Sequence, residues 1–311
     1  MLGYVPLHAG AAGEWVARFA LRVVRGRCCD PTESAMQFDS RVEFDRLVRG
    51  ATRRLTKPVR EMRNRVMFGV WVMRAKPVLV YQMGKVGSSS IRQSLAAAYQ
   101  GLSVNAHDFS GSHHNWMVRR LYRAVMEEGV PVDIISLIRE PIGRNVSAFF
   151  ENYERDTGTK YRTSDLTVEQ LRNMFLASYR HDLPLEWFEN HIESRFGIDV
   201  YATPFPQSGH ATYGSGKVRL LVVKVEIPDA EKEAAIGEFL DLHPFQMLRA
   251  NVGDLKVYAD RYRAFKQEVR LPADYVDRMC ASRYFNHFYS PETIEEVRRR
   301  WSEEAAAHGR P

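Results

Sequence analysis

Short apolar runs alternate with longer amphipathic stretches through the middle of the 311-residue chain. The runs "VLVYQ" (78–82), "LSVNA" (102–106), "VDIISLI" (132–138) and "VRLLVVKVE" (218–226) have the length of strands, and most are rich in β-branched residues. Nearly continuous apolar runs are typical of strands that are covered on both faces. The pattern therefore predicts an α/β fold in which a central parallel sheet lies between two layers of helices.

The stretches between these runs are predicted to be helices. The stretch "SSSIRQSLAAAYQG" (88–101) begins with serines, which favour helix starts, and ends at a glycine, which favours helix ends. Pro141 suits the first turn of another helix, which should continue to about Arg155. Further helices are expected at 114–129, 167–180, 184–196 and 229–243, and the tail from 255 to 304 is also expected to be helical.

Residues 1–76 contain no strand-like run and are predicted to form a helical N-terminal extension. Within it, "GEWVARFALRVVRG" (13–26) places Trp15 and Phe19 on one face, with arginines beside them. A helix of this kind could dock on the main domain or lie on a membrane surface. We expect the α/β domain itself to occupy residues 77–304.

Charge is distributed unevenly along the chain, whose formal net charge is +6. Residues 1–76 hold 15 Lys and Arg against 7 Asp and Glu, so the rest of the chain is slightly acidic. The plainest interpretation is a solvated basic helical surface. Peripheral contact with an anionic membrane is the alternative, and no nucleic-acid partner is expected.

Cysteine content and hydropathy predict a cytoplasmic protein. The three cysteines, Cys28, Cys29 and Cys280, provide neither a disulfide framework nor the spacing of a zinc site. No apolar stretch reaches the roughly 18–20 residues of a transmembrane helix. The first residues also lack the basic start and apolar core of a secretory signal.

The candidate chemistry begins with "YQMGKVGSSSIRQSL" (81–95), which joins a predicted strand to a predicted helix. A chain that turns through glycines into a helix N-terminus directs several backbone N–H groups at one point, where the helix dipole adds partial positive charge. Lys85 supplies a full charge, and the serines that follow supply hydroxyl donors. The loop is predicted to bind a phosphate or sulfate group. A glycine-serine turn without a ligand is the plain alternative.

This loop differs from that of the nucleoside triphosphatases. Their motif places the lysine directly after the last glycine, whereas Lys85 lies two residues before Gly87. A magnesium-binding aspartate is also expected at the end of a neighbouring apolar strand, but "IISLIRE" ends in Arg139 and Glu140. Binding of ATP with magnesium is therefore disfavoured, and no metal site is predicted.

The loop and a second motif, "REPIGRNVS" (139–147), together resemble the sulfotransferases that use 3′-phosphoadenosine 5′-phosphosulfate (PAPS). The shared features are Lys-x-Gly-Ser-Ser after the first strand, and Arg and Ser eight positions apart after a later strand. The segments "VYQMGKVGSSSI", "LIREPIGRNVSAFFENY" and "FNHFYSPETIEEVRRRW" are similar in sequence to those of a bacterial branch described as capsular polysaccharide synthesis proteins. The resemblance covers about residues 77–301 and implies a three-layer, P-loop-like core.

The resemblance also implies roles for individual residues. The loop residues Lys85, Val86, Gly87, Ser88, Ser89 and Ser90 would hold the 5′-phosphosulfate of PAPS, and Arg139 and Ser147 the 3′-phosphate. The segment "RANVGDLK" (249–256) is similar to one that closes over the nucleotide, so Asn251 is a candidate contact. The glycine-rich stretch 203–217 could line the acceptor entrance or form an exposed hairpin.

Sulfuryl transfer needs charge stabilisation and a general base. Lys85 would stabilise the charge that develops on the oxygen between sulfur and the departing phosphate. Histidine is the usual base for an acceptor hydroxyl. His107 follows the second predicted strand and therefore lies at the same sheet edge as the loop, while His113 and His114 are the nearby alternatives.

The sequence predicts a sulfotransferase that transfers a sulfuryl group from PAPS to a hydroxyl acceptor and requires no metal. The second product is the nucleotide that remains when PAPS has lost its sulfuryl group, 3′-phosphoadenosine 5′-phosphate (PAP). That the acceptor is a carbohydrate is implied by the resemblance alone. Two alternatives stay open: a nucleotide kinase or NTPase with a degenerate loop, and a non-catalytic protein that binds an anion or a polysaccharide.

Overall fold

The computed structural model describes residues 57–158, 160, 166–248 and 258–303. The predictions for the Trp15 helix and for Asn251 lie outside these residues. The chain divides into two compact units, residues 1–62 and 63–311. Helix α3 (Lys57–Arg74) extends across the boundary between them, and the second unit contains all the other helices and strands that are described.

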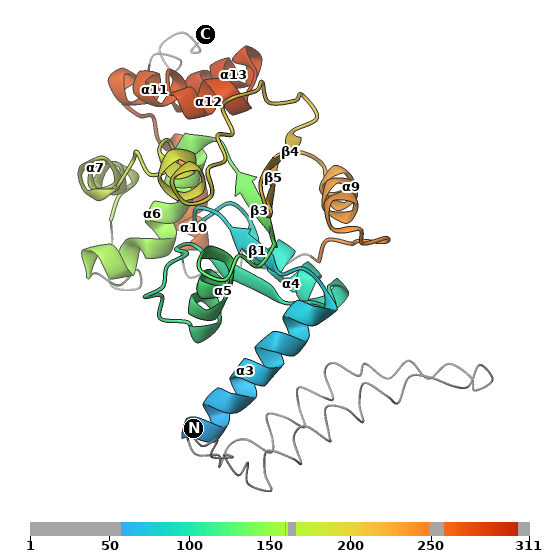
Figure 1. Cartoon of the computed structure of the whole chain (residues 1–311). Helices are drawn as coiled ribbons and strands as arrows, with labels where there is room; N and C mark the ends of the chain where they lie inside the picture. The colour runs from blue at the N-terminus through green and yellow to red at the C-terminus, as the bar shows by residue number, and fades with distance from the viewer. Residues whose placement is uncertain (1–56, 159, 161–165, 249–257, 304–311) are drawn as a thin grey trace, which may run out of the picture. The chain divides into compact units, whose positions relative to one another are not determined.

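A five-stranded sheet forms the centre of the second unit (Figure 1). Its order is β2 (Ser103–Ala106), β1 (Val78–Tyr81), β3 (Val132–Ile138), β5 (Val218–Lys224) and β4 (His210–Ser215). The four strands expected from the apolar runs are present and mutually parallel. Strand β4, from the glycine-rich stretch 203–217, forms a hairpin with β5 by pairing antiparallel with it, so the sheet is mixed rather than wholly parallel.

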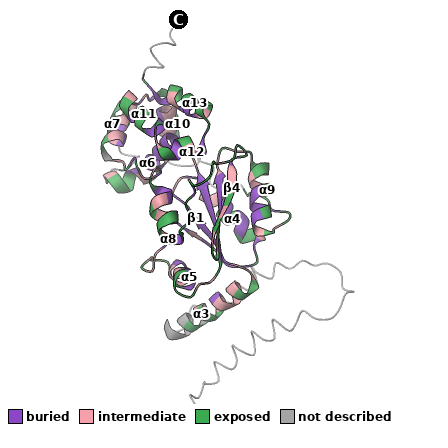
Figure 2. Ribbon diagram, turned by 45° about the horizontal axis from the view of Figure 1, so that its top comes forward, coloured by how far each residue is buried: buried purple, intermediate pink, exposed green. Residues whose placement is uncertain are grey.

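Helices cover both faces of the sheet, as the apolar strands require. The chain runs from β1 outward to β2 and then back past β1 to β3. Right-handed crossovers therefore place α4 (Ser88–Ala98) on one face, and α5 (Trp116–Met126) and α6 (Pro141–Thr157) on the other. Figures 1 and 2 show this arrangement, with α9 (Asp229–Leu240) on the same side as α4.

The apolar core lies on both sides of β1 and β3, whose residues are all buried. Helix α6 is buried along most of its length (Figure 2). The remaining helical elements are α7 (Val168–Ser178), the π-helix η2 (Phe188–Glu193), α8 (Ser194–Phe196), α10 (Ala259–Glu268), α11 (Ala273–Cys280), α12 (Arg283–Phe288) and α13 (Pro291–Trp301). In place of the single helix predicted at 184–196, the structure has the π-helix η2 followed by the short α8, and the described part of the predicted helical tail consists of four separate helices.

The strand order creates one special position at the carboxyl edge of the sheet. The connections that leave β1 and β3 diverge, because one leads to α4 and the other to α6 on the opposite face. Open α/β sheets bind ligands at such a switch point. In the part of the chain that the structure describes, no helix has the length and apolar character needed to cross a membrane.

Candidate functional site

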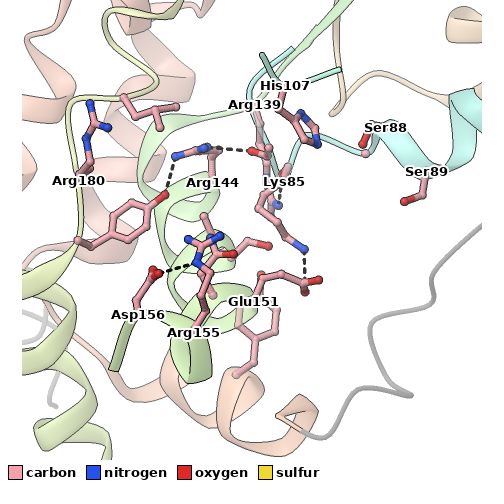
Figure 3. A pocket seen from close by; sticks show the side chains of 18 of the residues that line it. Lys85, Ser88, Ser89, His107, Arg139, Arg144, Glu151, Arg155, Asp156 and Arg180 are labelled. Carbon is pink, nitrogen blue, oxygen red and sulfur yellow. Dashed lines mark hydrogen bonds and ion pairs between the residues drawn. The ribbon is translucent and has the colours of Figure 1, made fainter. Parts of the chain in front are cut away.

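A cavity of about 910 Å³ opens at the carboxyl ends of β1 and β3 (Figure 3). Its volume is in the range of sites for small molecules and cofactors. Its lining includes five basic side chains and only two acidic ones. The lining residues are Gly84, Lys85, Gly87, Ser88, Ser89, Ser90, His107, Arg139, Arg144, Ser147, Ala148, Glu151, Asn152, Arg155, Asp156, Tyr179, Arg180, Leu183, Tyr258 and Tyr262.

The glycine-serine loop forms one wall of this cavity. Lys85 and Gly87 adopt left-handed backbone conformations, with φ of 73° and 86°. This conformation suits Gly87 and is uncommon for a lysine, so the turn that ends β1 is tightly specified. Gly87 caps α4 without a side chain, and the first N–H groups of any helix lack partners inside it. An anion in the cavity would therefore meet the positive end of α4.

Two arginines hold the backbone of this loop. Arg139 donates from Nη1 to the Lys85 carbonyl at 3.2 Å, and Arg144 donates from Nε to the Gly84 carbonyl at 3.0 Å. Arg144 is only 3% exposed and also donates to the Tyr179 hydroxyl at 2.8 Å. Sequence reasoning missed Arg144, although it lies in the same motif as Arg139, because nothing in the motif shows that the α6 side chain faces the loop.

The turn that contains Arg139 is held in place by hydrogen bonds to residues far along the chain, beginning with Tyr284 on α12. The Tyr284 hydroxyl donates to the Arg139 carbonyl at 2.9 Å and lies 3.2 Å from its N–H. Next along the chain, the Glu140 N–H donates to Glu226, whose other oxygen accepts from the Tyr289 hydroxyl, both at 3.0 Å. The position of Arg139 is therefore fixed by contacts that are distant in sequence.

Glu140 adds less negative charge beside Arg139 than its residue type suggests. Its carboxylate caps α6 by accepting from the Gly143 N–H at 2.7 Å. The pKa of this carboxyl group is raised to about 7, chiefly by burial; the Arg139 guanidinium acts in the opposite direction, and the Glu226 carboxylate contributes to the rise. Below neutral pH, Glu140 is therefore mostly protonated, and little of the charge of Arg139 is offset by its neighbour.

His107 is the one predicted base candidate that lines the cavity. Its Nδ1 lies 2.8 Å from the Gln82 carbonyl oxygen, which can only accept a hydrogen bond. Nδ1 therefore carries a proton, and in the neutral ring Nε2 is the basic atom. His113 and His114 stack on each other outside the lining, and His113 Nδ1 accepts from the Asn115 N–H at 3.0 Å.

The structure thus brings most of the predicted site residues together. Lys85, the loop glycine and serines, His107, Arg139 and Ser147 all line one cavity, whereas Val86 is buried and does not line it. Within the described residues, the Ser147 hydroxyl has no hydrogen-bond partner. The same residues contain no group of three or more His, Cys, Asp or Glu side chains that could hold a metal ion.

An acidic residue that sequence reasoning missed also lies in the site. Glu151 accepts from Lys85 Nζ at 3.1 Å and from the Tyr258 hydroxyl (Figure 3). It lies one helical turn after Ser147 on α6, and that spacing was the only signal in the sequence. In the absence of a ligand, this carboxylate offsets the charge of the loop lysine.

Comparison with known proteins gives one partial match. Residues 163–290 match the NKWYS family, described as "Putative capsular polysaccharide synthesis protein". No curated protein and no solved structure matches the chain. The matched segment starts after β3, so it excludes Lys85, His107 and Arg139, but it includes the cavity residues Tyr179 and Arg180 and the other lining residues that follow them.

Proposed function

We propose that this protein is a sulfotransferase that transfers a sulfuryl group from PAPS to a hydroxyl group of a carbohydrate. One observation carries the proposal: two sets of groups suited to binding anions, each following one of two neighbouring parallel strands, line a single cavity. Lys85 and the N-terminus of α4 follow β1, and Arg139 and Ser147 follow β3. The motif resemblance supplies the identity of the ligand, and with it the P-loop-like character of the core.

The lining fits a donor with two separated anionic groups. The excess of basic over acidic side chains favours a polyanion, and the cavity volume is sufficient for a nucleotide. Arginine suits a phosphate because its guanidinium donates two parallel hydrogen bonds. The unpartnered Ser147 hydroxyl, two helical turns after Arg139, could donate to the same phosphate.

The two predicted catalytic residues have distinct tasks. PAPS supplies a sulfur–oxygen bond that breaks as the acceptor oxygen attacks sulfur, with the bridging oxygen leaving on PAP. Lys85 would stabilise the negative charge on that bridging oxygen. His107 would accept the acceptor's proton at Nε2, because Nδ1 is fixed as a donor by the Gln82 carbonyl.

The carbohydrate acceptor is supported by the family description and by the part of the site that the match covers. The matched segment includes the wall of the cavity that contains Tyr179, Arg180 and Leu183, and also Tyr258 and Tyr262. Aromatic and apolar side chains beside polar ones are usual in sites for small organic ligands.

PAP is expected to stabilise the wild-type protein against heat, and ATP with magnesium much less. At about 100 times its dissociation constant, a ligand adds roughly 2.7 kcal/mol to the free energy of unfolding. For a domain of this size that corresponds to a rise in Tm of roughly 5–10 °C. The Arg139→Ala variant should lose most of this rise, whereas Arg299→Ala, at an exposed position on α13, should retain it.

The possible results separate the three candidate functions. A shift with PAP that depends on Arg139 supports the sulfotransferase. A shift with ATP and magnesium alone would instead indicate a kinase or NTPase. No shift with either ligand, together with a well-folded protein, would contradict both enzymes and favour a binding protein.

Replacing Glu151 with glutamine is expected to tighten PAP binding. The Glu151 carboxylate pairs with Lys85 and would repel an anionic ligand that needs the same lysine. Because both side chains are partly exposed, we expect only about a 2- to 5-fold lower dissociation constant. Isothermal titration calorimetry measures this, with Glu154→Gln, outside the cavity lining on the same helix, as the control. Weaker binding in Glu151→Gln would show that Glu151 orients Lys85 instead of competing with the ligand.

A further inference from the structure

Arg180 lines the cavity at the end of α7 and is exposed. Figure 3 shows it on the side of the cavity away from Ser88 and Ser89. In the described portion of the chain, its guanidinium makes no hydrogen bond or ion pair. By contrast, the other four basic side chains of the lining each have a protein partner. The Arg180 guanidinium can therefore bind a ligand without breaking a contact with any of the residues described.

The backbone beside Arg180 is firmly positioned. Its neighbour Tyr179 accepts a hydrogen bond from the buried Arg144 at 2.8 Å, and the Tyr179 ring is stacked 6.1 Å from that of Phe175. Tyr179 is also the C-cap of α7, where the helix dipole favours a positive charge. Arg180 thus directly follows a residue whose side chain is bound by the same arginine that donates to the Gly84 carbonyl of the loop.

The lining of the cavity that Arg180 shares combines positive charge with groups that suit a sugar. Arg155 also lines the cavity, but Asp156 pairs with Arg155 at 2.8 Å and offsets its charge. Asn152 is half-buried, and its amide has no partner among the residues described. Leu183, also half-buried, adds apolar surface to the lining. An amide, a free guanidinium and an apolar wall can bind hydroxyls, an acidic group and a sugar ring.

We propose that Arg180 binds an acidic group of the acceptor, so that the substrate is an anionic carbohydrate. This inference rests on the proposed function, because the proposed function assigns one anionic group of the donor to the glycine-serine loop before α4 and the other to Arg139 with Ser147. Arg180 then remains for a third anion, and that anion belongs to the acceptor. A carboxylate fits its guanidinium through two parallel hydrogen bonds.

Calorimetry on the PAP-bound protein tests this with defined probes. These are a glucuronate tetrasaccharide, its neutral carboxyl-reduced counterpart, and a tetrasaccharide that carries sulfate esters in place of carboxylates. The wild type should bind the glucuronate probe about 10- to 100-fold more tightly than the neutral one, as expected for a charge-assisted hydrogen-bonded pair. Arg180→Ala should remove this preference, Arg180→Lys should keep part of it, and Arg299→Ala should leave it unchanged. The sulfated probe distinguishes a carboxylate from a sulfate as the recognised group.

Binding of PAP itself, measured with the same variants, separates the two proposals. If PAP does not bind the wild type, the proposed donor is wrong, whatever the sugar probes show. If PAP binds and neither acidic probe is preferred over the neutral one, the inference about Arg180 is wrong and the sulfotransferase stands. If Arg180→Ala weakens PAP binding as much as Arg139→Ala does, Arg180 belongs to the donor site, and the inference is overturned.

Discussion

Replacing His107 with alanine is expected to lower kcat for sulfuryl transfer by about 10²- to 10⁴-fold, the usual contribution of a general base. The affinity for PAP should change little, because His107 would act on the acceptor proton and not on the nucleotide. The expected result rests on geometry: His107 lines the cavity, and the Gln82 carbonyl at 2.8 Å leaves Nε2 as the basic atom.

The measurement is transfer of radiolabelled sulfate from PAPS to whichever oligosaccharide probe turns over with the wild type. His113→Ala and His114→Ala are matched controls, because these two histidines lie outside the cavity lining and should keep nearly full activity. Added imidazole should restore part of the activity of His107→Ala, since the side chain is exposed and its removal leaves room. Full activity of His107→Ala, or a large loss in either control, would show that the base is another residue.

Replacing Arg144 with methionine is expected to lower the free energy of unfolding by about 3 kcal/mol. Its guanidinium donates to the Gly84 carbonyl, to Asn145 Oδ1 and to the Tyr179 hydroxyl, and hydrogen bonds to a charged group contribute about 1.5–3 kcal/mol each. Part of that loss is offset, because burial disfavours the charged guanidinium and lowers its pKa. The corresponding fall in Tm is roughly 6–12 °C.

Thermal and chemical unfolding measure this effect, and PAP titration should show weaker binding because the Gly84 carbonyl loses its support. Arg144→Lys keeps the charge but cannot reach all three acceptors, so it should recover only part of the stability. Arg299→Met, at an exposed site, should unfold like the wild type. A stable Arg144→Met protein with unchanged PAP affinity would mean that the loop holds its shape without Arg144.

The elements of the core follow from short-range patterns. The buried strands β1 and β3 have apolar side chains on both faces, so their sequences alone distinguish them from the amphipathic helices around them. The antiparallel strand β4 is different, because its residues are partly exposed and the stretch around it, 203–217, is rich in turn-forming residues. Its place in the sheet comes from pairing with β5 and not from a pattern of its own.

The same distinction applies to the site. Lys85, Gly87 and Arg139 could be found from the sequence because Arg139 directly follows β3, Lys85 and Gly87 lie in the short loop after β1, and parallel strands end at one edge. Glu151 and Arg144 were missed, since their roles depend on which side of α6 faces the loop. The choice of His107 over His113 and His114 likewise depended on which of them lines the cavity.

The sequence by itself determined the four parallel strands, most of the helices around them and the positions of the loop and of Arg139, because these depend on neighbours a few residues apart. The tertiary structure alone decided how the site is held and charged. Tyr284 contacts the Arg139 backbone across 145 positions, and Lys85 meets Glu151 across 66. Such contacts leave no local pattern, because they arise only when distant segments pack against the same edge of the sheet.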